Sequence, residues 1–445
     1  MYLYYIYDKI FSVICNMAPT TTTTTAAAAE TSSSPTSAST TTKLENKTKQ
    51  KTVNPFKNCC RLFHWGPCLA LTIIFLISFM SLTCTLIWWP ISTAGGLLNL
   101  SIFIIWDILT LYNYFMAVIN GPGFVPHGWK PKVAGEEKFL QYCVECKGHK
   151  APRSHHCRKC KRCVMKMDHH CPWINTCCGY LNHANFIYFL FFAPCGCIHG
   201  AFILIGSLIQ LLNNPYYLYH MNGEPMVQLS ILGFIIVVFS IGLAVGVIVA
   251  VGMLFCIQFH EVLKNETAIE SWIIEKAKSR ERDPSESEFI YPYNLGWKNN
   301  LKLVFWPTDE IKSNGISWPV IDSCNQYTLT VEQLIQKAQK KERVVLLDIV
   351  QNYSGYWFPF SKGCRVVYNI PCSDEARIPL SVGDVVEVSR GRRYWLYGTK
   401  VNKEDTDQPR VRGWFPRCCA RERNTKEMSQ DIKSEIEDEN EKKKN

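Results

Sequence analysis

The tetrapeptide Asp168-His169-His170-Cys171 lies inside a stretch, residues 143–178, that holds eight of the 21 cysteines of the chain. Cysteines and histidines recur in this stretch at the short intervals of metal-binding loops, and core packing does not produce such clusters. A thiol beside a possible base and several metal ligands suits nucleophilic chemistry. Long hydrophobic segments flank the stretch, which predicts that it lies at a membrane surface.

The spacing offers more ligands than two zinc ions need. Cys143 and Cys146 form one Cys-x2-Cys pair, and Cys157 and Cys160 form another. Zinc prefers four Cys or His ligands in a tetrahedron, and these can be separated in sequence. The residues available to complete the two sites are His156, Cys163, His170 and Cys177. Cys171 then remains free to act as a nucleophile. The alternative is that the whole stretch is only a zinc-stabilised adaptor module.

Four apolar runs predict membrane-spanning helices. They cover residues 68–89, 97–119, 186–212 and 229–259. Each reaches the ~20 residues that a helix needs to cross the hydrocarbon layer. The chain has 445 residues and is 47% hydrophobic, which fits a mixture of membrane-embedded and aqueous domains. A transporter is disfavoured because the runs contain almost no charge that could mark an ion path.

The charges of the loops predict the orientation in the membrane. The net charge is +10, but the basic residues flank the apolar runs and form no aromatic-lined groove, which disfavours nucleic-acid binding. The loop of residues 120–185 has eleven Lys and Arg against four acids, whereas the loops at 90–96 and 213–228 have no Lys or Arg. Both termini and the cysteine-rich loop are therefore expected in the cytosol. Thiols stay reduced there, which favours metal sites over disulfides.

The region before the C-terminus alternates short apolar runs with turns. Runs at residues 380–388, 394–398 and 413–416 predict a small β-barrel. This pattern resembles an SH3-like domain, although Tyr394 stands where the first of two tryptophans is expected and Cys419 where a tyrosine is expected. The polar N-terminal residues and the charged C-terminal residues lack hydrophobic periodicity and are predicted to be disordered.

The cysteine-rich stretch resembles the DHHC-type protein S-acyltransferases, or palmitoyltransferases. The resemblance extends from the first apolar run to about Trp306, and two short elements depart from it. Alanine replaces the second threonine in Thr267-Ala268-Ile269-Glu270, and Gly121 replaces an aspartate before Pro122-Gly123. The motifs that match are Lys150-Ala-Pro-Arg153-x-His-His156-Cys157, Asp168-His169-His170-Cys171-Pro-Trp173-Ile-Asn175, Gly179-x2-Asn182-x3-Phe186 and Tyr293-x2-Gly296-x3-Asn300.

The resemblance implies two interleaved structural zinc sites and a catalytic triad. Cys171 would be the nucleophile, His169 the base that takes its proton, and Asp168 the carboxylate that orients the imidazole. Cys171 would accept an acyl group from long-chain acyl-CoA, such as palmitoyl-CoA, and pass it to a cysteine of a client protein. One zinc ion would be bound by Cys143, Cys146, His156 and Cys163, and the other by Cys157, Cys160, His170 and Cys177.

Three basic residues of the loop are candidates for contacts with the CoA phosphates. They are Arg153 and Lys150, with Lys161 as a third candidate, and contacts with lipid headgroups are the alternative. Asn300 is expected to support the active-site region structurally. The expected partners are clients with cytosolic juxtamembrane cysteines and an accessory protein at the SH3-like domain. The ending Lys442-Lys443-Lys444-Asn445 resembles a dilysine signal and predicts residence in the endoplasmic reticulum membrane.

These inferences predict a polytopic α-helical membrane protein with four transmembrane helices, a cytosolic double-zinc cysteine-rich domain and a C-terminal SH3-like β-barrel. The expected boundaries are a disordered tail at 1–57, two membrane helices at 58–119, the zinc domain at 120–185, two further membrane helices at 186–259, the family's C-terminal motifs and a linker at 260–340, the SH3-like domain at 341–421 and a charged tail at 422–445.

Overall fold

The structure is a computed structural model that describes residues 59–422, except 90, 214–218, 220–227, 283, 310, 374 and 402–410. Apart from residue 422, both tails predicted to be disordered lie outside the described residues. The dilysine-like ending lies outside them as well.

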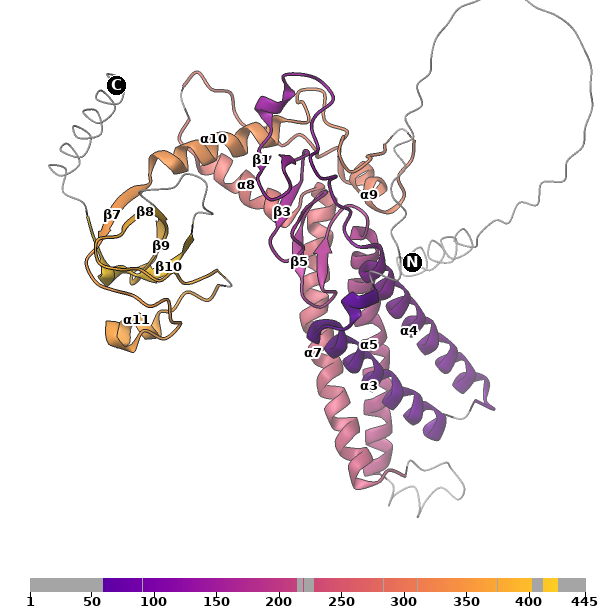
Figure 1. The fold of residues 1–445 in the computed structure, drawn as a ribbon. Helices are drawn as coiled ribbons and strands as arrows, with labels where there is room; N and C mark the ends of the chain where they lie inside the picture. Colours follow the sequence, from indigo (N-terminus) through magenta and orange to yellow (C-terminus); the bar gives the residue numbers. More distant parts are fainter. Residues whose placement is uncertain are drawn as a thin grey trace, which may run out of the picture. The chain divides into compact units, whose positions relative to one another are not determined.

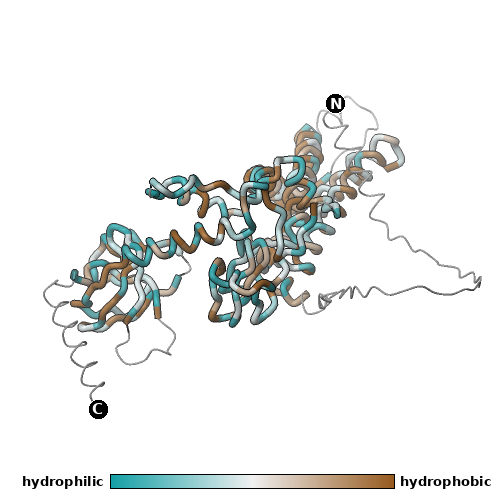
Figure 2. The backbone as a smooth tube through the Cα atoms, turned by 90° about the horizontal axis from the view of Figure 1, so that it is seen from above, coloured by the Kyte–Doolittle hydropathy of each residue, from teal (hydrophilic) through white to brown (hydrophobic). Residues whose placement is uncertain are grey.

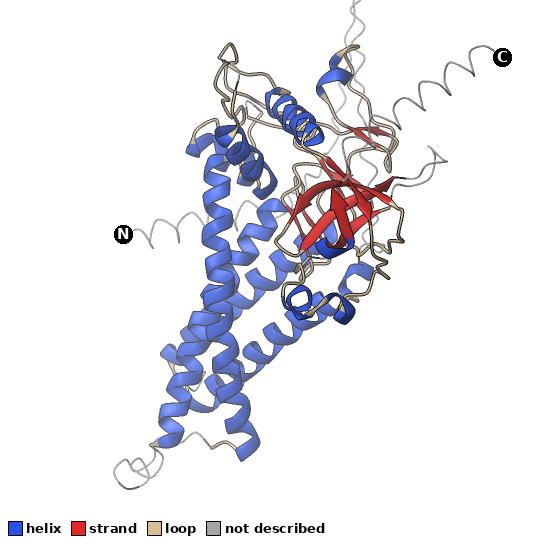
Figure 3. Cartoon of the chain, turned by 90° about the vertical axis from the view of Figure 1, so that its left-hand side faces the viewer, coloured by secondary structure: helices blue, strands red, loops and turns tan. Residues whose placement is uncertain are grey.

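Four long helices form the apolar part of the molecule (Figures 1 and 3). They are α3 (Trp65–Trp88), α4 (Ala94–Asn120), α5 (His183–Leu212) and α7 (Ile231–Lys264). All four are long and apolar enough to cross a membrane, which confirms the four predicted spans. Helix α5 packs against the other three, and apolar side chains fill the contacts. Figure 2 shows the hydrophobic residues of the backbone in brown.

The helix ends follow from local capping. The Thr93 side chain accepts a hydrogen bond from the Gly96 N–H at the start of α4, and the Ser230 side chain accepts one from the Gly233 N–H at the start of α7. Such caps satisfy N–H groups that lack a partner inside the helix. Helix α7 continues to Lys264, beyond the predicted end of the apolar run, and therefore carries its last turn to the cysteine-rich region.

The cysteine-rich region contains three successive two-stranded hairpins. They are β1 (Tyr142–Cys143) with β2 (Gly148–His149), β3 (His155–Cys157) with β4 (Arg162–Val164), and β5 (His169–Cys171) with β6 (Thr176–Cys178). The turn of each hairpin includes a residue with positive φ, which is Lys147, Lys161 or Asn175. Each turn therefore has a left-handed residue at the same place, four residues after the last cysteine of the first strand.

Three helices follow the last span: α8 (Ala268–Ser279), α9 (Trp297–Phe305) and α10 (Thr328–Glu342). Thr267 caps α8 in a capping box with Glu270. The completely buried Asn300 of α9 donates to the carbonyl oxygen of Leu263 at 2.8 Å, and its Oδ1 accepts from the Leu295 N–H at 3.0 Å. Asn300 thus ties α9 to the end of α7, in agreement with its expected structural role.

The C-terminal domain is a five-stranded antiparallel sheet with the order β10-β9-β8-β7-β11. Its strands are β7 (Val345–Ile349), β8 (Val385–Gly391), β9 (Trp395–Val401), β10 (Arg412–Pro416) and β11 (Ala420–Glu422), and η3 (Phe360–Lys362) and α11 (Cys364–Tyr368) lie between β7 and β8. Trp395 and Phe415 are buried at the centre of its core. The predicted apolar runs at 380–388, 394–398 and 413–416 overlap β8, β9 and β10. Among the described strands, β10 and β11 remain edges, so the sheet does not close into the predicted barrel by hydrogen bonds.

Candidate active site and metal centres

The hairpins bring cysteine and histidine side chains into two clusters that could each hold a metal ion. Within each cluster the ligand atoms all lie within 4.8 Å of one another. The clusters are Cys143, Cys146, His156 and Cys163, and Cys157, Cys160, His170 and Cys177. These are the two sets that the resemblance implied.

The separations inside the clusters suit tetrahedral zinc. His156 Nδ1 lies 3.4 Å from Cys143 Sγ and 3.5 Å from Cys146 Sγ. In the second cluster, His170 Nδ1 lies 3.4 Å from Cys160 Sγ and 3.6 Å from Cys177 Sγ. Zinc binds sulfur at about 2.3 Å and nitrogen at about 2.0 Å, so tetrahedral ligands are about 3.5–3.8 Å apart. The residues present therefore fit such an ion.

The clusters arise from a repeat of 14 residues that sequence reasoning missed. Cysteines at 143, 157 and 171 end the first strand of each hairpin, and the residues three places later are Cys146, Cys160 and Ile174. In the second and third hairpins a histidine pairs across the strands with a cysteine: His156 with Cys163, and His170 with Cys177. Each cluster combines the turn of one hairpin with the cross-strand pair of the next. The equal spacing of the three turns was the signal that could have revealed it.

Cys171 occupies the ligand position of the third hairpin but belongs to neither cluster. Its side chain is buried and packs in an apolar cluster with Tyr114, Ile174, Phe186 and Leu190. Partly buried side chains of α3 and α7 complete this surrounding. The thiol therefore faces an apolar environment made by the membrane helices.

Asp168 and His169 form a close pair beside this cysteine. His169 Nδ1 lies 2.5 Å from Asp168 Oδ2. Burial alone would raise the pKa of the Asp168 carboxyl, but the hydrogen bond and charge of His169 hold it below its ordinary value. Burial likewise lowers the pKa of His169, while Cys178, Asp168 and Cys171 together raise it well above its ordinary value. The imidazole is thus placed to hold a proton close to two thiols.

Two further groups position Asp168. The backbone N–H of Ala268 donates to Asp168 Oδ1 at 2.7 Å. This is a backbone contact, so it does not need the threonine hydroxyl that this chain lacks. Gln258 Nε2 donates to Asp168 Oδ2 at 3.2 Å and to Glu261 Oε2 at 2.8 Å. Sequence reasoning missed Gln258 because it lies in an apolar run without a motif.

Arg153 has a different role from the one predicted. Its side chain is fully buried, with Nε 2.7 Å from Glu270 Oε1 and Nη2 2.7 Å from Glu270 Oε2. Nη1 donates to Asn265 Oδ1 at 3.1 Å, and the guanidinium lies 4.5 Å from the Tyr293 ring and 4.7 Å from the Trp318 ring. No part of it is open to a phosphate. The prediction that Arg153 contacts CoA is therefore wrong, because the guanidinium joins the cysteine-rich region to the segment after α7.

Two nearby lysines differ in environment. Lys150 is half-buried, and its Nζ donates to Gln141 Oε1 at 3.3 Å. Lys166 is buried, with its Nζ 5.8 Å from the centre of the Trp318 ring. Burial, with a further contribution from Arg153, lowers the pKa of Lys166 to about 7.

The chain is similar to known proteins over most of its length. The model of the family described as DHHC palmitoyltransferase matches residues 136–275. Palmitoyltransferase ZDHHC6 of Homo sapiens is 45% identical over 376 residues, which cover 81% of this chain and 91% of the relative. The Danio rerio protein of the same name is 46% identical over 380 residues, with the same two shares. Probable protein S-acyltransferase 16 of Arabidopsis thaliana is 31% identical over 251 residues, 52% of this chain and 78% of that protein.

Proposed function

This chain belongs to the DHHC palmitoyltransferase family and is a protein S-palmitoyltransferase, and we propose that Cys171 carries the acyl group between acyl-CoA and the client protein. The observation that carries this proposal is the position of Cys171. It ends a strand of the hairpin series, stays outside both metal clusters and lies next to the His169–Asp168 pair. Its apolar surroundings come from the membrane helices.

The first step forms an acyl-enzyme. His169 takes the proton of the Cys171 thiol, with Asp168 holding the imidazole through Nδ1. The thiolate attacks the thioester carbonyl carbon of acyl-CoA, the new carbon–sulfur bond forms, and the bond to the CoA sulfur breaks. The CoA thiolate leaves with the proton from His169. In the second step a client thiol loses its proton to His169 and attacks the carbonyl carbon of acyl-Cys171. The bond from this carbon to the Cys171 sulfur breaks, and Cys171 takes the proton back from His169.

The two clusters are proposed to bind structural zinc. Three cysteines and one histidine in each suit zinc, which supplies folding free energy to small loop-rich domains. Neither ion takes part in the transfer. The three hairpins depend on both ions for their mutual placement, because each cluster joins two hairpins.

The apolar surroundings of Cys171 suit a long acyl chain. A chain loses about 0.8 kcal/mol for every CH₂ left in water, so contact with α4, α5 and α7 favours binding of palmitoyl-CoA. The CoA group is polar and stays in the aqueous phase. Lys150 remains the proposed contact for its phosphates, since Arg153 is committed to Glu270.

The proposal also includes the orientation of the chain in the membrane, its domain boundaries and its cellular location. The distribution of Lys and Arg supports cytosolic termini and a cytosolic cysteine-rich domain, with the boundaries predicted above. The final lysines support residence in the endoplasmic reticulum membrane. The five-stranded sheet supports an SH3-like domain that could receive an accessory protein.

Labelling with an alkyne analogue of palmitoyl-CoA tests the chemistry. The purified chain should acquire a hydroxylamine-labile label, and Cys171→Ser should lose it while keeping two zinc ions and its unfolding temperature. Cys178→Ser is the matched control, because Cys178 is also buried, also near His169 and also outside both clusters. A Cys171→Ser protein that loses zinc and still transfers acyl groups would instead show that Cys171 is a metal ligand and that another residue carries the acyl group.

A further inference from the structure

Residues 356–370 of the C-terminal domain expose large aromatic side chains. Tyr356, Phe358 and Phe360 are 74%, 61% and 77% exposed, and we call these three residues the aromatic surface. The core of the domain is filled by other side chains, so these rings are not part of it. Several large exposed aromatic residues within one short segment mark an interaction site.

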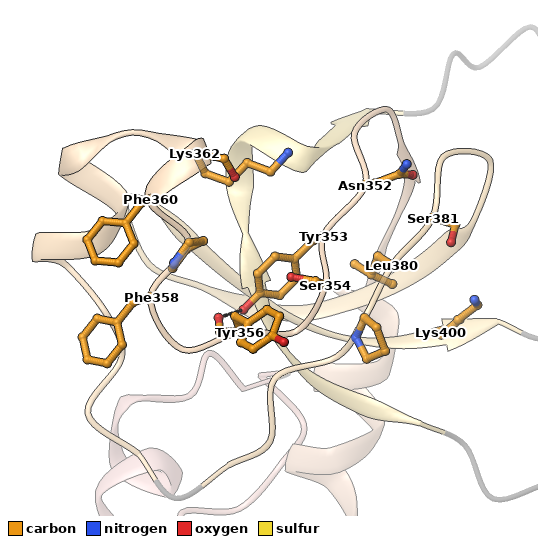
Figure 4. Close-up of a pocket in the computed structure, with 13 residues that line it drawn as sticks. Asn352, Tyr353, Ser354, Tyr356, Phe358, Phe360, Lys362, Leu380, Ser381 and Lys400 are labelled. Atoms are coloured by element: carbon orange, nitrogen blue, oxygen red, sulfur yellow. Dashed lines mark hydrogen bonds between the residues drawn. The ribbon is translucent and has the colours of Figure 1, made fainter.

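The aromatic surface is built on a fixed frame. The Tyr353 hydroxyl donates to the Tyr356 carbonyl oxygen at 2.6 Å, and Pro359 is buried between two exposed phenylalanines. The rings of Phe358 and Phe360 are stacked, with centroids 6.4 Å apart. Figure 4 shows Tyr356, Phe358 and Phe360 at a pocket of about 660 Å³. The rings are therefore held outward and do not collapse onto the sheet.

The charge around the aromatic surface is positive. Residues 356–370 include Lys362 and Arg365 and no acidic residue. Arg365 is exposed, whereas Lys400, which lines the same pocket as Lys362, is paired with Asp384 at 2.7 Å and adds no net charge. Aromatic rings beside basic residues are typical of surfaces that bind the headgroup region of bilayers with anionic lipids.

The partner that fits is a phospholipid surface. The four spanning helices keep the C-terminal domain close to a bilayer, so even weak affinity is enough for contact. We propose that the aromatic surface docks the C-terminal domain onto the membrane in which the chain is embedded. The rings enter the headgroup region, and Lys362 and Arg365 lie near lipid phosphates. This docking does not depend on which cysteine carries the acyl group.

Photo-crosslinking of the full chain tests the contact. Benzoylphenylalanine replaces Phe360 in one variant and Val411, an apolar residue of the same domain that is 51% exposed, in the matched control. Both are reconstituted in nanodiscs of phosphatidylcholine with phosphatidylserine. We expect lipid adducts at position 360 at about ten times the yield at position 411. Equal yields, or adducts at position 360 with protein alone, would overturn the proposal and favour a peptide ligand.

Hydrogen exchange of the unaltered chain gives a second test without any substitution. Adding phosphatidylserine to phosphatidylcholine nanodiscs should slow exchange in residues 356–370, because each basic residue near an anionic surface gains about fivefold in binding. The variant Lys362→Gln with Arg365→Gln should lose this lipid dependence, while exchange in β9 stays unchanged. If phosphatidylserine does not change the exchange rate of residues 356–370 in the unaltered chain, membrane docking is rejected.

Discussion

Replacing Arg153 by alanine should unfold the cysteine-rich region without a specific effect on CoA binding. The substitution leaves the Glu270 carboxylate, whose side chain is 1% exposed, without its partner in the protein interior. Breaking a buried ion pair from one side costs about 3–5 kcal/mol. The stacking on Tyr293 and Trp318 is lost as well and adds about 1 kcal/mol or more.

Two further variants separate the contribution of the Arg153 charge from that of its hydrogen bonds. Arg153→Lys keeps the charge but cannot donate two parallel hydrogen bonds to Glu270 and a third to Asn265, so it should lie between alanine and the unaltered chain. Replacing both Arg153 and Glu270 by leucine removes both buried charges. The double variant should therefore be more stable than Arg153→Leu alone, and the cycle of Arg153→Leu, Glu270→Leu and the double variant would show this as a coupling between the two sites.

The assay combines thermal unfolding in nanodiscs with the KM for palmitoyl-CoA. We expect a lower unfolding temperature for Arg153→Ala and, in the fraction that remains folded, an unchanged KM. An unaltered unfolding temperature together with a strongly raised KM would refute the burial argument and return Arg153 to the CoA site.

Four other outcomes follow from the site. His169→Ala should slow acyl-enzyme formation on the order of 10²- to 10⁴-fold with zinc content unchanged, measured by labelling kinetics. Cys143→Ala and Cys157→Ala should each lower both the zinc content and the folded yield, measured by metal analysis, and full zinc in either would contradict the cluster assignment. Gln258→Leu should lower kcat with little change in KM, because a hydrogen bond to a carboxylate contributes about 1.5–3 kcal/mol. A kcat equal to that of the unaltered chain would show that the Ala268 N–H alone positions Asp168. The pKa of Lys166 is about 7 in the folded chain, which is lower than in the unfolded chain. Above pH 7 the unfolded chain therefore binds more protons at this residue, and the free energy of unfolding should rise from pH 7 to about 10. Lys166→Met should remove that rise in unfolding temperature.

The spans and the metal ligands could be predicted because they depend on local sequence. Hydropathy over 20 or so residues identifies a spanning helix, and Cys-x2-Cys spacing identifies a metal-binding turn. The role of Arg153 could not be predicted in this way. Its partner Glu270 is 117 residues away, and nothing in the spacing of the two reveals their contact. The position of Arg153 in a basic loop favours an anionic substrate, whereas tertiary packing buries its side chain.

Other misses have similar causes. Gln258 lies in an apolar run without a motif, and only the path of the last turns of α7 brings it to Asp168. The strands of the C-terminal domain were predicted from alternation, but closure of a barrel depends on which edges meet, and alternation contains no information about that.

The number of hairpins decides which cysteine stays outside the metal clusters. A cysteine at the end of a hairpin's first strand joins a metal cluster only when the next hairpin places a histidine and a cysteine against that turn. Cys143 and Cys157 each have such a successor, but the chain enters α5 after the third hairpin. Ile174 stands where a second sulfur would be, and it packs with Cys171 among apolar residues. The third turn therefore leaves Cys171 outside both clusters, which is the condition that the proposed acyl transfer requires.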